Sequence, residues 1–120
     1  MVKEAGEFVI NIPGTDQLEG SKFCGSKSGK DYDKFAECNF TAIQASKVDA
    51  PMIEECPINL ECKTTQIVHV GTHDLFIAEV LAVHIDESVL DDKGRVDIAK
   101  VQLFTYMPLT GQYWSIGEQL

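Results

Sequence analysis

The chain has few positive charges. Its 120 residues include 10 Lys and Arg against 19 Asp and Glu, which gives a formal net charge of −9, and Arg95 is the single arginine. Proteins that bind a nucleic-acid backbone need clustered Lys and Arg. The composition therefore argues against a nucleic-acid partner, although one local positive site would be enough for a small anionic ligand.

Long apolar runs are also missing. No run approaches the ~20 residues that a helix needs to cross a bilayer, so we expect no membrane partner. The first seven residues, MVKEAGE, are too acidic and too poor in apolar side chains for a signal peptide. With 44% hydrophobic and 24% charged residues, the composition predicts one globular domain over residues 1–120, with a cytoplasmic location.

Cysteine spacing typical of a metal site is absent, because no C-x-x-C occurs. Without a secretory signal, a disulfide framework is not expected either. We expect reduced and mostly buried thiols, the two nearest the predicted helices serving as packing residues, at Cys24, Cys38, Cys56 and Cys62. A metal site that joins His69 and His73 to a cysteine has no obvious acidic fourth ligand and is not favoured.

The first third of the chain predicts a strand followed by two short helices. Residues 8–13 read as a short strand that Pro13 ends. The turn after it can begin a helix that reaches about Phe23. After a polar loop, a second short helix is predicted from Asp31 to Asn39.

The middle of the chain predicts a long β-hairpin. From residue 58 apolar and polar side chains alternate, so that a half-buried strand would point Ile58, Leu60 and Cys62 to one side and Asn59, Glu61 and Lys63 to the other. A slip in phase near residues 66–67 suggests a bulge before the strand ends at Val70. Gly71-Thr72 is a tight reversal, and the return strand runs from His73 to Asp86.

Both faces of the return strand are mostly apolar, so we expect both to be covered. In a domain of this size the domain's own core covers one face, and a helix or another subunit covers the other. Residues 96–99 predict a single helical turn, and residues 103–107 and 112–116 predict two last strands. Strands dominate and connections are short, which predicts an antiparallel barrel or sandwich with two small helices.

Several segments, in this order, resemble the flavin reductase-like, FMN-binding split-barrel family, and most closely its flavoredoxin-type branch. They are FVINIP at 8–13, CG at 24–25, SGKD at 28–31, DKF at 33–35, APMIEECP at 50–57, LEC at 60–62, GTH at 71–73 and the ending YWSIG at 113–117. The resemblance implies a mainly β fold, an antiparallel split β-barrel of the Greek-key, FMN-binding type. It also implies a homodimer that binds FMN non-covalently, with NAD(P)H as a co-substrate.

The resemblance implies roles for individual residues. The Gly71-Thr72-His73 step is similar to the family's Gly-x-His motif, so His73 would lie near the nicotinamide and is the catalytic candidate. The flavin-binding candidates are Asn11, Ser28, Gly29, Lys30 and Lys34. The resemblance implies phosphate or ribityl contacts for Ser28, Lys30 or Lys34, and Asn11 would face the ligand from its strand.

Each candidate also has a purely structural explanation. His73 could be a strand-end histidine satisfied by backbone, and Asn11 could satisfy a buried backbone group. Ser28 to Asp31 precede a helix N-terminus, where phosphate binds readily, but two aspartates there would repel an anion. The aromatic residues Tyr106, Tyr113 and Trp114 would cover a flavin ring or, more commonly, pack in a core or a dimer interface.

Two departures from the family leave alternatives open. Family members carry strands upstream of the position of Phe8, so this chain corresponds to the C-terminal portion of the family fold and its barrel would have open edges. Ala78 stands where the family usually has glycine. The chain is therefore a possible NAD(P)H:flavin oxidoreductase, a non-enzymatic FMN-binding electron carrier, or a truncated dimerisation module that no longer binds flavin.

Overall fold

The computed structural model describes residues 5–26 and 34–120. The elements in chain order are β1 (Glu7–Ile12), η1 (Thr15–Gln17), α2 (Leu18–Ser26), α3 (Lys34–Glu37), β2 (Ala42–Gln44), β3 (Pro51–Ile53), β4 (Ile58–Val70), β5 (His73–Ile85), η2 (Glu87–Val89), α4 (Ile98–Val101), β6 (Phe104–Met107) and β7 (Gln112–Ser115). No helix in the described residues is long and apolar enough to cross a membrane.

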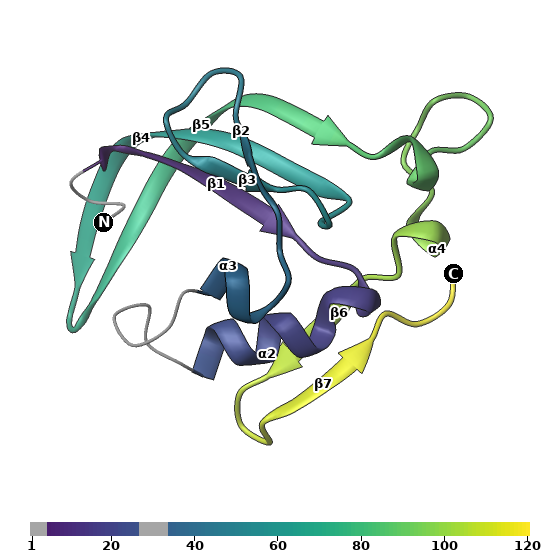
Figure 1. Ribbon diagram of the computed structural model, residues 1–120. Coiled ribbons are helices and arrows are strands. Elements are labelled where there is room, and N and C mark those ends of the chain that lie inside the picture. The colour runs from purple at the N-terminus through teal and green to yellow at the C-terminus, as the bar shows by residue number, and fades with distance from the viewer. Residues whose placement is uncertain (1–4, 27–33) are drawn as a thin grey trace.

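All strand pairing is antiparallel and forms three small sheets (Figure 1). The largest sheet has the order β1-β4-β5, while β2 pairs with β3 and β6 pairs with β7. Its frame is the predicted hairpin, in which β4 and β5 have 13 residues each. Gly71 has a φ of +60° at the reversal, a conformation that glycine adopts without steric cost.

The end of this hairpin projects beyond the rest of its sheet. The register of β1 on β4 ends at Glu7 and Lys63, so residues 65–77, here called the hairpin arm, form a two-stranded ribbon. The predicted slip is a register shift between Thr64 and Gln66. Exposed apolar side chains on the arm are Val70, Leu75 and Ile77. No third strand pairs with the arm within the described chain, and a lone two-stranded ribbon is only marginally stable in water.

The strand register defines the two faces of the three-stranded sheet. Paired residues share a face, and alternate residues of one strand do too. The first face, called the Glu61 face, carries Val9, Asn11, Asn59, Glu61, Ala82 and His84. The opposite face, called the Leu60 face, carries Phe8, Ile10, Leu60, Cys62, Val80 and Val83.

Burial on β4 differs from the simple expectation for an alternating strand. The predicted division into two sides is correct, yet the polar side is buried, with Asn59 at 5% and Glu61 at 0% exposure. On the apolar side Cys62 is buried, but Ile10, Val80 and Val83 are each 43% exposed or more. The β2–β3 segment covers the Glu61 face. Hydrogen bonds compensate for the burial of Glu61 and of the Asn59 Nδ2 group, whereas Asn59 Oδ1 has no partner among the described residues.

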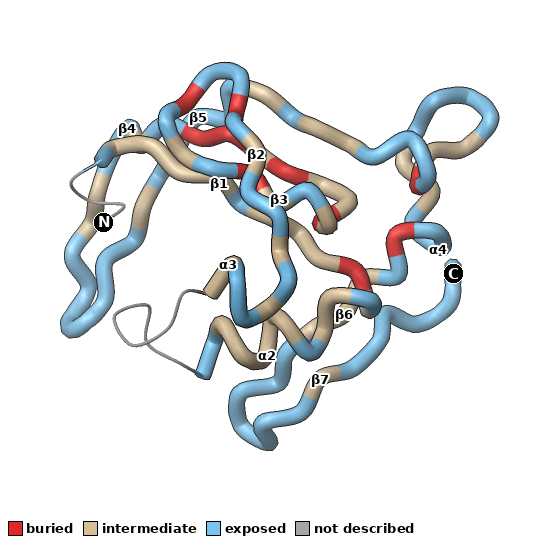
Figure 2. Tube along the Cα trace, viewed as in Figure 1, coloured by how far each residue is buried: buried red, intermediate tan, exposed pale blue. Residues whose placement is uncertain are grey.

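The apolar core lies over the Glu61 face, where β2 and β3 pack against β1. Its buried members are Ala45, Val48 and Met52, against which Val9, Ile43 and Ala50 pack. Figure 2 shows the buried segments gathered around the crossing of β2 and β3 with the long strands, with a second group near α4. The strands β2 and β3 were not predicted from the sequence, because each has only three residues and β3 begins with Pro51.

The short helices lie close to their predicted positions. Helix α2 extends to Ser26, and α3 ends at Glu37, two residues before the predicted stop at Asn39, whose φ of 56° is left-handed. The predicted start of α3 at Asp31 lies outside the described residues. The last helix begins two residues later than predicted because Asp97 is its N-cap and accepts from Ala99 N at 3.1 Å.

Helix α2 is held by an aromatic ring packed on a glycine. A Cβ atom added at Gly20 would lie 2.6 Å from Cζ of Phe40, so the ring occupies the space that any side chain would need. This close approach fixes the segment after α3 against α2. It brings the two helices, and the cysteines at their ends, together.

Candidate functional site

A fully buried carboxylate organises the centre of the Glu61 face. The Glu61 oxygens accept from the backbone N–H groups of Ser46, Lys47 and Val48 at 3.0, 2.5 and 3.1 Å. The Ser46 hydroxyl donates at 2.8 Å, and His84 Nε2 lies within hydrogen-bond distance. These five donors surround a side chain with no solvent exposure. The network therefore ties residues 46–48 to the sheet.

The same donors control the protonation of Glu61. Burial alone would raise the pKa of this carboxyl group, but the backbone N–H groups of Ser46 and Lys47, with His84 and the Ser46 hydroxyl, outweigh burial and hold it well below its usual value. The group is therefore a carboxylate at neutral pH. A carboxylate whose acceptor positions are filled from the chain itself is a structural anchor rather than a free base.

The catalytic candidate His73 lies next to the turn that joins β4 to β5. His73 is the first residue of β5, paired with Val70, and it is exposed. In the next pair Nδ1 of His69 and Oδ1 of Asp74 lie 2.5 Å apart. No hydrogen bond of the His73 imidazole is found within residues 5–26 and 34–120. The position leaves His73 open to a ligand or a partner, and its nicotinamide role stays a prediction.

Two of the flavin-binding candidates lie in the described chain and are engaged by backbone. Asn11 Oδ1 accepts from Ile53 N at 3.1 Å, which links β1 to β3. Lys34 Nζ donates to the carbonyl oxygen of Cys24 at 2.7 Å, at the end of α2. Each retains donors without a partner among the described residues, namely the Asn11 Nδ2 group and two ammonium protons of Lys34.

The other flavin-binding candidates cannot be placed. Ser28, Gly29 and Lys30 lie outside the described residues. No hydrogen bond joins His73, Asn11 and Lys34 to one another in the part of the chain that is described. The sequence-predicted site is therefore represented by separate positions on β5, β1 and α3.

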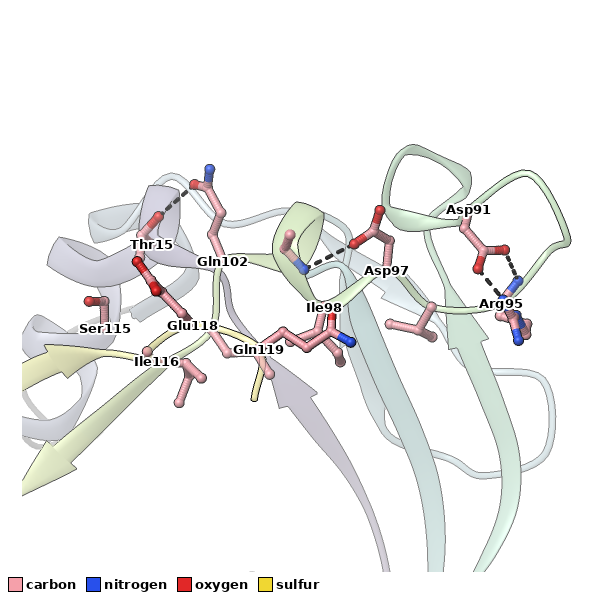
Figure 3. A pocket seen from close by; sticks show the side chains of 14 residues that line it. Thr15, Asp91, Arg95, Asp97, Ile98, Gln102, Ser115, Ile116, Glu118 and Gln119 are labelled. Atoms are coloured by element: carbon pink, nitrogen blue, oxygen red, sulfur yellow. Dashed lines mark hydrogen bonds and ion pairs between the residues drawn. The ribbon is translucent and has the colours of Figure 1, made fainter.

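A hollow of about 1030 Å³ lies at the other end of the molecule (Figure 3). It is lined by η1, the segment around α4 and the last residues, with Thr15 Oγ1 donating to Gln102 Oε1 at 2.9 Å. Its charged lining residues are Asp91, Arg95, Asp97 and Glu118. The Arg95 Nε group already donates to Asp91 at 3.2 Å. This acidic lining disfavours a phosphorylated cofactor.

The C-terminal aromatic residues form a surface cluster. The rings of Tyr106 and Tyr113 have centroids 4.9 Å apart, and Lys22 Nζ lies 5.2 Å from the Tyr113 centroid. Tyr106 is 50% exposed and Trp114 is 57% exposed. These two residues do not pack in a core of this chain, which leaves an interface or a ring-covering role open to them.

The sequence analysis missed a contact between two cysteines. Sγ of Cys24 in α2 lies 3.2 Å from Sγ of Cys38, which directly follows α3. Both side chains are partly exposed, whereas Cys56 and Cys62 are buried. A spacing of 14 residues carries no motif, so only the folded arrangement of α2 and α3 could reveal the pair.

Comparison with known proteins gives a consistent answer. The model of the flavin reductase like domain family matches residues 1–107. The flavoredoxin of Desulfovibrio vulgaris (Miyazaki F) superposes with a TM-score of 0.91 at 35% identity, over 99% of this chain and 63% of that one. The flavoredoxin of Methanosarcina acetivorans gives a TM-score of 0.90 at 29% identity, over 99% and 62%.

One of the curated relatives carries a named activity. FMN reductase (NADH) RutF of Pseudomonas syringae pv. syringae (strain B728a) is 33% identical over 78 residues, which are 65% of this chain and 42% of that protein. The chain spans about half the length of the curated relatives that it matches, with 55% and 46% for two archaeal examples. The predicted fold class, a mainly β antiparallel split barrel, is confirmed.

Proposed function

We propose, from the premise that this chain belongs to the flavin reductase-like domain family, that it is an FMN-binding flavoprotein of the flavin reductase type. It would pass electrons from NAD(P)H through FMN to an acceptor. The observation that carries the proposal is the match over residues 1–107 combined with the near-complete superposition on flavoredoxins. Relatives named FMN reductase (NADH) and NADH:riboflavin 5′-phosphate oxidoreductase support the same activity.

The described residues fit a flavin in part. Lys34 has two ammonium protons left for a phosphate after its bond to Cys24, and Asn11 has a free amide for a carbonyl or hydroxyl oxygen. The exposed apolar side chains Ile10, Val80 and Val83 of the Leu60 face could pack against a planar ring. Asn11 lies on the opposite face of the sheet, so its amide would not contact a ring bound there. Ser28, Gly29 and Lys30 would complete the polar contacts.

The roles of protein and cofactor are distinct. When bound, FMN supplies the hydride-transfer chemistry. The chain would bind the phosphate through Lys34, orient the ring on apolar side chains and exclude water. His73, exposed at the mouth of the hairpin, would contact the nicotinamide ring of the electron donor.

The proposal includes a homodimer. The hairpin arm exposes Val70, Leu75 and Ile77, and the Leu60 face exposes three more apolar residues. In addition, β1 and β5 are edge strands of the described sheet, with unpaired backbone groups along one side. Exposed apolar side chains and open strand edges of this kind are typical of an interaction surface. A second subunit would cover it and could complete the flavin site.

The direct test is an FMN titration of the purified chain followed by quenching of flavin fluorescence. We expect saturable micromolar binding, and we expect Lys34→Met to weaken it by about tenfold or more, a change of about 1.4 kcal/mol. Lys100→Met is the matched control, because Lys100 Nζ also donates to a backbone carbonyl, that of Leu90 at 3.0 Å. Absence of quenching in the wild-type chain would refute the flavoprotein proposal for this chain.

A second candidate is an FMN-binding electron carrier without a pyridine-nucleotide site. The two superposed structures named flavoredoxin favour it, as does Ala78, which is partly buried opposite Thr64. NADH or NADPH oxidation by the FMN-loaded chain separates the two functions. Turnover that His73→Ala lowers and His69→Ala leaves unchanged would support the reductase, whereas tight FMN binding without turnover would support the carrier.

A further inference from the structure

Two thiols meet where the ends of α2 and α3 come together. The Sγ atoms of Cys24 and Cys38 lie 3.2 Å apart, and Cys38 Sγ also donates to the carbonyl oxygen of Gly20 at 3.5 Å. A disulfide bond is about 2 Å long, so the sulfurs need to approach by roughly one ångström. Both cysteines are partly exposed, which gives a small oxidant access that the buried Cys56 and Cys62 lack.

We propose that Cys24 and Cys38 form an oxidisable dithiol, which a peroxide or a small-molecule disulfide converts into an intramolecular disulfide that joins α2 to the turn after α3. This site goes beyond the proposed flavin chemistry and does not depend on it. The thiol content of the chain reports on the dithiol whether or not flavin binds.

The reaction balances with hydrogen peroxide as the oxidant. The thiolate of one cysteine attacks a peroxide oxygen, the O–O bond breaks, and a sulfenic acid and one water form. The sulfur of the other cysteine then attacks the sulfenic sulfur, the S–O bond breaks, and a second water leaves. The two thiols lose two protons and two electrons in total, and the peroxide takes them up as water. A disulfide oxidant would accept the same electrons by thiol–disulfide exchange.

The surroundings of Cys38 favour its protonated form. Burial, the hydrogen bond to Cys24, and the charges of Cys24 and Glu37 raise the pKa of Cys38 to about 11, against a smaller opposing effect of Lys34. Cys38 is therefore protonated at neutral pH and loses its proton in the course of disulfide formation, because the thiolate is the nucleophile.

The dithiol shares a residue with the proposed flavin site. The Lys34 ammonium group donates to the carbonyl oxygen of Cys24 at 2.7 Å, so the backbone of one reacting cysteine holds a phosphate-binding candidate. A disulfide at this point would fix α2 and α3 at the positions that set the place of Lys34. Oxidation of the pair would therefore make the contact between α2 and α3 more rigid.

The test uses the full chain, reduced, freed of reductant and then exposed to hydrogen peroxide or oxidised glutathione. After unfolding in the presence of N-ethylmaleimide, the reduced chain takes up four equivalents, one for each free cysteine. We expect the oxidised chain to take up two, with an intact mass lower by about 2 Da before alkylation. Peptide mapping should recover Cys24 joined to Cys38.

Variants assign the bond to this pair. Cys24→Ser and Cys38→Ser should each abolish the mass loss, whereas Cys56→Ala, which removes a buried thiol on another element, should retain it. Phenylarsine oxide, which bridges close thiols, provides a readout on the unaltered chain and should protect two cysteines from alkylation. Four alkylated thiols after oxidation, disulfides between chains, or loss of the bond in Cys56→Ala would each overturn the proposal.

Discussion

The two faces of the sheet β1-β4-β5 differ in burial, and the more polar face is the one that this chain covers. The Glu61 face buries polar side chains, Glu61 completely and Asn59 almost completely. The Leu60 face is apolar, yet Ile10, Val80 and Val83 are substantially exposed. The first face is covered within this chain, and hydrogen bonds satisfy its buried polar groups except Asn59 Oδ1, which has no partner among the described residues. The described residues leave the second face without a cover, so the two faces separate what the chain stabilises alone from what we expect another surface to stabilise.

The physical balance differs on the two faces. A buried carboxylate is tolerated when several donors replace the water that it loses, and Glu61 has five. Exposed apolar side chains have no such internal compensation, and only contact with another apolar surface removes them from water. We therefore expect the Glu61 face to determine the stability of the isolated chain and the Leu60 face to determine whether the chain associates.

Removal of the carboxylate gives the largest expected effect. Glu61→Ala leaves the N–H groups of Ser46, Lys47 and Val48 without their acceptor in a buried site. We expect the Tm to fall by more than about 10 °C, measured by circular dichroism. Glu79→Ala is the matched control, since Glu79 is exposed on the neighbouring strand and should change the Tm little. Equal shifts for the two variants would contradict the anchoring role of Glu61.

Acid should destabilise the chain through the same residue. The pKa of Glu61 in the folded state lies below the ordinary value of 4.5, so its contribution is fully present above that pH and is lost as the pH falls toward the folded pKa. Urea unfolding between about pH 6 and about pH 3 should show a free energy of unfolding that falls from about pH 4.5 downward. Glu61→Gln should be less stable and show a flatter profile, and an unchanged slope would argue against this linkage.

The Leu60 face should respond in association rather than in folding. Val83 is 54% exposed, and a lysine there would place a charge in any interface that covers it. We expect Val83→Lys to change the free energy of unfolding of the monomer by less than about 0.5 kcal/mol and to weaken self-association by about tenfold or more, measured by sedimentation. Leu109→Lys, at a fully exposed loop position, is the control. A wild-type chain that stays monomeric at every concentration would contradict the dimer.

The two long strands of the sheet could be predicted from the sequence, but which of the two faces is covered could not. Alternation on β4 and the Gly71 turn located both long strands, because side-chain period and turn chemistry are local properties. Alternation also divided β4 correctly into two sides. It could not say which side is covered, because the donors that make burial of Glu61 possible are the backbone N–H groups of residues 46–48, and a backbone group carries no signal in the sequence.

The candidate site was less accessible to prediction. The structure shows backbone partners for Asn11 in β3 and for Lys34 in α2, which lie 42 and 10 residues away in the sequence. The Cys24–Cys38 contact depends in the same way on the packing of Phe40 against Gly20, which brings two helix ends together. Residue types alone indicated what each side chain could do, and tertiary packing decided which partner it found.

The smallest expected effect comes from the pair His69–Asp74. Its comparison with the pair His84–Glu61 shows how burial changes the strength of a histidine–carboxylate contact. His69 and Asp74 have the same chemistry as His84 and Glu61, but the His69 side chain is 66% exposed and Asp74 is 32% exposed. Water competes for both groups there, and exposed pairs contribute about 0.2–1 kcal/mol. We expect His69→Ala to lower the free energy of unfolding by about 0.5 kcal/mol at most, measured by urea unfolding at pH values on both sides of an ordinary histidine pKa. A loss as large as that of Glu61→Ala would mean that the hairpin arm, and not the covered Glu61 face, limits the stability of the chain.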